Sequence, residues 1–135
     1  MTTLNINVTP EVAMAIEEVR DTFPGLPVKV REDGSGGAFV IVEGVKTGPL
    51  YKQEETWVGF RITYMYPNAD VYPHYVRDDL TRIDGKGHGS AIQTGQSFEN
   101  RPAIQISRRS LRLNPNTDTA ALKLVKVLEW LRTQS

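Results

Sequence analysis

The chain of 135 residues contains no cysteine, and this absence excludes more chemistry than any other feature of its sequence. Without a thiol, the chain has no disulfide bond, no thiolate ligand for zinc and no cysteine nucleophile. Its formal net charge is +0, so overall charge does not favour nucleic acid or a membrane surface as a partner. No apolar run approaches the roughly 20 residues that a membrane-spanning helix needs.

Histidine is also scarce, which limits metal binding and acid–base chemistry. His74 and His88 are the only histidines, and their spacing from Asp70, Asp78 and Asp79 matches no metal site that we recognise. We therefore expect no metal and no cofactor, and we expect each histidine to be solvated or hydrogen-bonded. The N-terminus lacks the basic region and the apolar core of a signal peptide, which predicts a cytoplasmic protein.

What is present is the composition of an ordinary globular domain. Hydrophobic residues make up 39% of the chain and charged residues 24%, and a chain of this length is long enough to bury a core. The sequence contains no internal repeat and no stretch that resembles an interdomain linker. We therefore expect a single domain over residues 1–135.

Two segments have the apolar periodicity of amphipathic helices. The first is predicted to run from Pro10 to about Phe23, with Thr9 as its N-cap. The second is predicted to run from about Thr119 to Arg132. The residues that we expect to be buried come from both helices and from the strands between them: Val12, Ile16, Val19, Val40, Phe60, Ile62, Leu124, Val127, Leu128 and Leu131.

Three segments between the helices have the pattern of β-strands, namely Val28–Arg31, Ala38–Val42 and Trp57–Met65. Their short connections favour an antiparallel meander, and we expect a sheet of three to four strands in an α+β fold. Because the prolines that follow cannot donate ladder hydrogen bonds, we expect the sheet to end near Tyr66. The polar segment Asp78–Asn100, which contains several glycines, is predicted to be a long loop.

The order of these segments, together with short motifs, resembles a known family. Tyr66-Pro67 and Tyr72-Pro73 form a segment of tyrosine and proline, Ala103-Ile104-Gln105-Ile106 follows the long loop, and Pro115 precedes the second helix. This succession resembles the ubiquitin-conjugating (E2, or UBC) fold, and its shortened form looks like the bacterial E2-like proteins. The resemblance implies a UBC-like α+β fold with an N-terminal helix, an antiparallel β-meander, a long active-site loop and a C-terminal helix packed on the sheet.

In that family a cysteine carries the activated ubiquitin-like protein, and Ala103 stands in its place. An E2 accepts the C-terminal carboxylate of a modifier from an E1-like activator as a thioester and passes it to an amine. Alanine has no nucleophilic side chain, so it can neither accept the modifier as a thioester nor pass it to an amine. The resemblance leaves two functions open. The first is an E2-like conjugating enzyme in which Ala103 replaces a native cysteine. The second is a non-catalytic UBC-fold module that binds a ubiquitin-like protein or scaffolds its activating enzyme. An unrelated α+β binding domain, for which the matched order is coincidence, is a third alternative.

The resemblance also implies partners. It predicts an E1-like activating enzyme and a ubiquitin-like modifier, with a JAB-type deconjugating protease in the same pathway, and neither a membrane nor nucleic acid. Candidate contacts with the activating enzyme lie on the first helix and on the strand that follows it: Glu11, Glu17, Glu18, Arg20, Asp21, Lys29 and Arg31.

Asn100, Arg101, Arg108 and Arg109 are the candidate binding residues around Ala103. Guanidinium groups bind carboxylates through paired hydrogen bonds, so these arginines would hold the acidic tail of a modifier; the alternative is a solvated basic face. We expect Ala103 to lie beside a shallow groove bordered by Asn100, Arg101 and the long loop, within reach of solvent. Periodicity alone favours a small buried residue on a short strand instead. The family's His-Pro-Asn tripeptide is missing here, so no asparagine is matched to oxyanion stabilisation.

Overall fold

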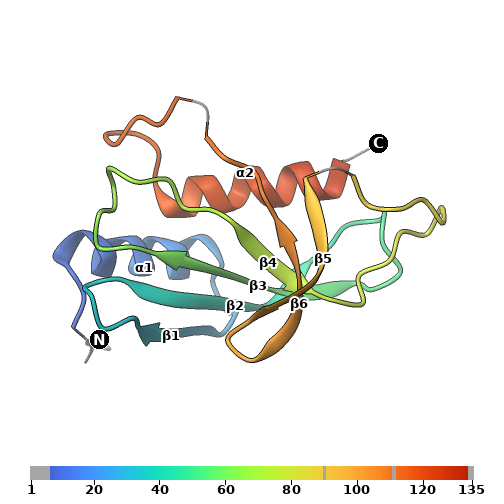
Figure 1. The fold of residues 1–135 in the computed structure, drawn as a ribbon, viewed down its shortest axis with the longest axis horizontal. Coiled ribbons are helices and arrows are strands. Elements are labelled where there is room, and N and C mark those ends of the chain that lie inside the picture. The colour runs from blue at the N-terminus through green and yellow to red at the C-terminus, as the bar shows by residue number, and fades with distance from the viewer. Residues whose placement is uncertain (1–6, 90, 111, 134–135) are drawn as a thin grey trace.

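The computed structural model describes residues 7–89, 91–110 and 112–133. Within these residues, two helices and six strands follow one another along the chain. They are α1 (Pro10–Thr22), β1 (Val28–Glu32), β2 (Ala38–Lys46), β3 (Glu55–Ile62), β4 (His74–Arg77), β5 (Ile92–Phe98), β6 (Arg101–Ile106) and α2 (Ala120–Thr133). Both helices pack on the same face of the sheet (Figure 1).

The strands form one antiparallel sheet in the order β1-β2-β3-β4-β6-β5. The first four strands are neighbours in chain order, as a meander requires, whereas β6 pairs with β4 and leaves β5 at the edge. The prediction of an α+β fold with an antiparallel sheet is confirmed. The predicted strand number is wrong, since the described part of the chain contains six strands rather than three to four.

Both predicted helices are confirmed to within one residue at each end. The hydroxyl of Thr9 accepts a hydrogen bond from the backbone N–H of Val12 at 3.1 Å. The hydroxyl of Thr119 accepts one from the backbone N–H of Leu122, also at 3.1 Å. These side chains satisfy N–H groups that the first helical turn leaves without a partner. Neither of the two described helices has the length and apolar content needed to cross a membrane.

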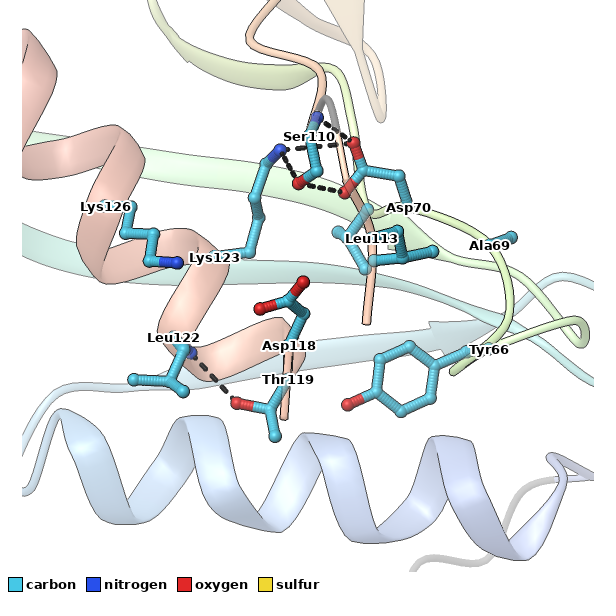
Figure 2. Close-up of a pocket in the computed structure, with 11 residues that line it drawn as sticks. Tyr66, Ala69, Asp70, Ser110, Leu113, Asp118, Thr119, Leu122, Lys123 and Lys126 are labelled. Atoms are coloured by element: carbon cyan, nitrogen blue, oxygen red, sulfur yellow. Dashed lines mark hydrogen bonds and ion pairs between the residues drawn. The ribbon is translucent and has the colours of Figure 1, made fainter. Parts of the chain in front are cut away.

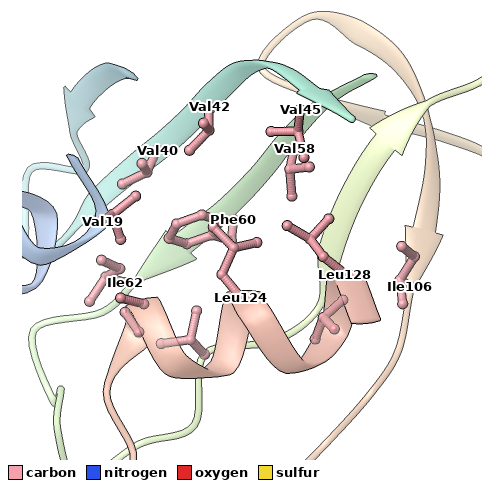
Figure 3. Close-up of a cluster of buried hydrophobic side chains, with 14 of the residues drawn as sticks. Val19, Val40, Val42, Val45, Val58, Phe60, Ile62, Ile106, Leu124 and Leu128 are labelled. Atoms are coloured by element: carbon pink, nitrogen blue, oxygen red, sulfur yellow. The ribbon is translucent and has the colours of Figure 1, made fainter. Parts of the chain in front are cut away.

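The main hydrophobic core lies between the helices and the sheet. Figure 3 shows Val19 of α1, Phe60 of β3 and Leu124 and Leu128 of α2 around one interior. Every side chain that the sequence predicts to be buried is buried, which confirms that prediction. Burial of a side chain of this size contributes roughly 1.5–3 kcal/mol, so the docking of two apolar helix faces stabilises the fold more than any polar contact.

A smaller cluster of aromatic side chains covers the opposite face of the sheet. Phe98, at the end of β5, stacks on Tyr75 with ring centroids 4.9 Å apart and on Trp57 at 6.3 Å. The Phe98 ring fills the space above Gly59, where a Cβ would lie 2.5 Å from it. The two residues that follow Phe98 both have positive φ, as the tightest hairpin turns require. The tip of the β5–β6 hairpin therefore folds onto β3.

Two expectations about the sheet are wrong. The segment Asp78–Asn100 contains β5, whose side chains are mostly exposed and polar, so it lacks the apolar alternation that predicts a strand. The sheet also does not end near Tyr66, because the chain returns to it as β4 at His74. The two prolines of the connection, Pro67 and Pro73, follow cis peptide bonds and lie outside the strand, where no ladder donor is needed.

Candidate functional site

Ala103 lies in the middle of the sheet and has no exposed surface. On β6 it pairs with Arg77 of β4 on one side and with Gln96 of β5 on the other. Its methyl group belongs to the aromatic cluster, with Ile41 and Phe98. The expectation that Ala103 is within reach of solvent is therefore wrong, because the β5–β6 hairpin folds over this face, and the alternative of a small buried residue on a short strand is confirmed. That Ala103 corresponds to the family's cysteine stays a prediction.

Arg101 lies near the tip of the hairpin, and its charge is neutralised. Its guanidinium donates to both carboxylate oxygens of Glu43, at 3.2 and 2.8 Å, and lies 5.2 Å from the centre of the Trp57 ring. Lys29 adds a second ion pair to the same carboxylate at 3.1 Å. These cations hold the pKa of Glu43 below its usual value. Asn100 occupies the turn beside this group, with φ of 64°.

Arg108 and Arg109 lie beyond the other end of β6. The strand β6 is extended from Arg101 to Ile106, so its two ends lie roughly 17 Å apart. The structure therefore divides the four predicted binding residues into two pairs rather than gathering them around Ala103. Arg108 lies over Trp130 at 4.8 Å, and Arg109 lies over Tyr72 at 4.7 Å and donates a hydrogen bond to its hydroxyl.

A groove of about 260 Å³ runs between this segment and α2. We call it the basic groove. Its lining contains five cations and no carboxylate: Arg108, Arg109, Ser110, Arg112, Lys123, Lys126, Val127 and Trp130. Lys123 and Lys126 were not among the predicted binding residues. Their spacing of three residues places them on one side of α2, a signal that becomes informative only once the neighbouring segment is known.

Three residues from distant parts of the chain meet where this groove adjoins a neighbouring pocket, and Figure 2, which shows that pocket, has them pointing toward one another. Asp70 accepts hydrogen bonds from the backbone N–H of Ser110 at 2.6 Å and from its hydroxyl at 3.0 Å. The ammonium of Lys123 donates to Asp70 at 3.2 Å and to the Ser110 hydroxyl at 2.7 Å. We call these residues the Asp70 latch, since they tie the segment after β6 to α2 and to the β3–β4 connection.

The Asp70 latch has the composition of a serine–lysine pair but not its chemistry. Burial acts to raise the pKa of Asp70, but the hydrogen bonds from Ser110 and Lys123 outweigh it and hold that pKa below its usual value. Lys123 is ion-paired with this carboxylate and donates to Ser110, so it offers no free lone pair to take the hydroxyl proton. The arrangement therefore supports a structural tie rather than nucleophilic catalysis.

His74 is fully buried on β4 beside this end of the sheet. Neither ring nitrogen has a hydrogen-bond partner within the described residues, and the ring packs 5.4 Å from that of Phe60. Burial, with a smaller effect of Lys123, lowers the pKa of His74 to about 3. The expectation that His74 is solvated or hydrogen-bonded is wrong, whereas Nε2 of His88 lies 2.9 Å from the carbonyl oxygen of Leu80.

The predicted contacts with an activating enzyme lie on two faces of the molecule, on α1 and on the face of the sheet opposite to the helices. Glu11 and Asp21 are exposed on α1. On β1, Lys29 pairs with Glu43, and Arg31 pairs with Glu99 of the hairpin turn at 2.8 Å. No group of three or more potential metal ligands occurs among the described residues. Comparison with family models, curated proteins and solved structures finds no match.

Proposed function

We propose that this chain is a non-catalytic, UBC-like module that binds a ubiquitin-like protein. The observation that carries the proposal is the position of Ala103, which is fully buried in a chain without cysteine. The order of a first helix, an antiparallel meander and a last helix on the same face of the sheet is compatible with the UBC fold. A module of this kind keeps the recognition of a modifier and omits the transfer.

The argument against transfer is steric as well as chemical. A thioester forms only when a thiolate reaches the carboxyl carbon of the modifier. At position 103 any side chain points into the cluster beneath Phe98, and the hairpin tip is held by the ion pair of Glu99 with Arg31. A nucleophile at this position would need the hairpin to open before it could react.

Titration of the ¹⁵N-labelled protein with each ubiquitin-like protein and each E1-like activator of the source genome tests the proposal. We expect saturable chemical-shift changes with a modifier, and no covalent adduct when activator and ATP are added. Absence of binding to every modifier and every activator would remove the binding role.

The conjugating enzyme is the second proposal, supported by the Ala103-Ile104-Gln105-Ile106 motif and the preceding order of elements. Its test is Ala103→Cys with activator, ATP and modifier on a non-reducing gel. The buried site predicts no reductant-sensitive adduct, and an adduct would favour the enzyme over the module. Ser107→Cys is the matched control, because it places a thiol at a partly exposed position on the same segment.

A further inference from the structure

Most of the positive charge of this protein is neutralised within the fold. Nine of its 16 lysines and arginines form an ion pair with a carboxylate, and all 16 lie in the described residues. Of the remaining seven, four line the basic groove: Arg108, Arg109, Arg112 and Lys126. Of the other three, Lys52 lies between β2 and β3, Lys86 lies between β4 and β5, and Arg132 lies near the end of α2. A chain of zero net charge thus concentrates its available cations at one place.

Two guanidinium groups of the basic groove, those of Arg108 and Arg109, are positioned before any ligand arrives. Arg108 lies over Trp130 of α2, and Arg109 lies over Tyr72. The Asp70 latch holds the neighbouring Ser110 against α2. A guanidinium that lies over a ring is oriented by it, while the N–H groups in the plane of the guanidinium can still donate to a ligand, apart from the one that Arg109 donates to Tyr72. Less side-chain entropy is then lost on binding, which favours affinity.

The four available cations of the basic groove form no ion pair with a carboxylate of the described residues. The groove lining contains no acidic residue. Asp70 lies close enough to act on the charge of Arg109, but its oxygens already accept hydrogen bonds from Lys123 and from both donors of Ser110. All four available cations are exposed. A ligand that supplies carboxylates therefore completes the charge pairing that the rest of the fold already has.

We propose that the basic groove binds the carboxylates of an extended peptide segment from a partner protein. The inference rests on the proposed function only in taking that partner to be a protein. Its volume of about 260 Å³ lies below the roughly 300–1,000 Å³ of sites that enclose small molecules, and it suits a chain that crosses an open channel. Paired N–H groups of arginine match the two oxygens of a carboxylate.

The same features disfavour nucleic acid. Single strands bind by stacking bases on exposed aromatic rings along a long basic track. Here Trp130 and Tyr72 are already covered by Arg108 and Arg109, and the available cations are limited to four. With zero net charge, the chain offers no wider attraction for a polyanion.

The test uses fluorescence anisotropy with three octapeptides and the intact chain. One alternates glutamate with glycine and has an amidated end, one replaces glutamate with glutamine and has a free C-terminal carboxylate, and one replaces glutamate with glutamine and is amidated. The third peptide has no carboxylate. We expect it to bind at least about tenfold more weakly than whichever of the first two binds more tightly, in line with two charge-assisted contacts. The first two separate acidic side chains from a chain end as the source of the carboxylate.

The variant Arg112→Gln/Lys126→Gln removes two groove charges without removing an aromatic contact. We expect it to weaken binding of the preferred peptide about tenfold, whereas Lys52→Gln/Lys86→Gln, which removes the same charge elsewhere, leaves binding within about twofold. Equal effects of the two variants overturn the inference, as does tighter binding of an octamer of uridylate than of any peptide. If a modifier binds but the groove variant holds the preferred peptide as tightly as the unchanged chain does, the groove inference fails and the proposed function stands. If acidic peptides bind but no modifier does, the proposed function fails and the groove inference stands.

Discussion

The two ends of β6 carry the same type of residue in opposite electrostatic settings. At the hairpin end, Arg101 lies over Trp57 and donates to both oxygens of Glu43. At the groove end, Arg108 lies over Trp130 in a similar way but has no carboxylate partner among the described residues. Aromatic stacking positions an arginine in both settings, whereas the presence of a carboxylate decides whether its charge is available to a ligand.

The hairpin end should depend on Phe98 more than on any other side chain. We expect Phe98→Ala to lower the free energy of unfolding by about 3–5 kcal/mol, because the ring fills the space above Gly59 and joins three strands of the sheet. Urea denaturation measures this loss. Trp130→Ala is the matched change at the groove end, and it should cost less because Trp130 is only partly buried.

The same variant also tests why position 103 is closed. A thiol placed by Ala103→Cys should react slowly with a thiol reagent in the otherwise unchanged chain and much faster when Phe98→Ala is added, since the ring covers this site. Equal rates in the two backgrounds would show that the hairpin tip does not close the position.

As pH falls, the protein should first lose stability through His74, which lies at the groove end of β6. His74 pairs with Ile106, the last residue of β6, and its folded pKa is lowered to about 3 from 6.5. Between these values the unfolded chain binds a proton that the folded chain does not, so stability falls as pH falls. We expect a loss of about 1.4 kcal/mol per pH unit below 6.5, or about 3 kcal/mol at pH 4.5. Thermal unfolding between pH 7 and 4.5 measures it.

His74→Leu is the control for that pH dependence. It removes the titrating ring and two buried polar atoms that have no partner, so stability at pH 7 should stay the same or rise, and the slope above pH 4.5 should flatten. Glu43 and Asp70, whose pKa values are lowered, contribute stability that is lost only below about pH 4.5 and 3.8, so they do not act in this window. An unchanged slope in His74→Leu would assign the acid loss to another group.

Breaking the Asp70 latch should have an intermediate effect. Asp70→Asn keeps the shape of the side chain but leaves Lys123, which is 11% exposed, without its counter-charge. We expect the free energy of unfolding to fall by about 2 kcal/mol, the size of a hydrogen bond to a charged group. The freed ammonium should also make the basic groove tighter for an acidic peptide, and weaker binding would mean that the latch mainly positions Ser110. Ser110→Ala separates these roles, because it keeps the ion pair.

The smallest effect should come from making the hairpin end resemble the groove end. Glu43→Gln removes the carboxylate shared by Arg101 and Lys29, and we expect a loss of about 1 kcal/mol, since the pair is partly exposed. This variant should gain weak, salt-sensitive binding of the acidic peptide at the hairpin end. Glu55→Gln, which removes only the exposed pair with Lys46, should change neither stability nor binding. If Glu43→Gln gains no binding, an unpaired arginine on an aromatic ring is not sufficient for a site.

Elements with strong apolar periodicity were predictable from the sequence. Both helices and their buried stripes were correct, because a repeat near 3.6 residues specifies the face that must leave water. The strand β5 was not predictable in this way, since its stability comes from backbone pairing with β6 at an edge where polar side chains are tolerated.

The candidate site was predicted in part. Arg108 and Arg109 were named from the sequence and do line the groove, but Asn100 and Arg101 belong to the other end of β6. Sequence proximity grouped these residues because they flank one short segment. An extended strand separates its ends by more than 3 Å per residue, so neighbours along the chain become distant in space.

The sequence by itself determined the fold class, the two helices, most of the core and the absence of thiol chemistry. Only the tertiary structure decided which charges are available. Sixteen cations and 16 acids are equivalent in composition, but Arg101 meets Glu43 across 58 positions and Lys123 meets Asp70 across 53. The physical reason is that ion pairing acts over a few ångströms, and such distances are set by how the sheet and helices pack rather than by order along the chain.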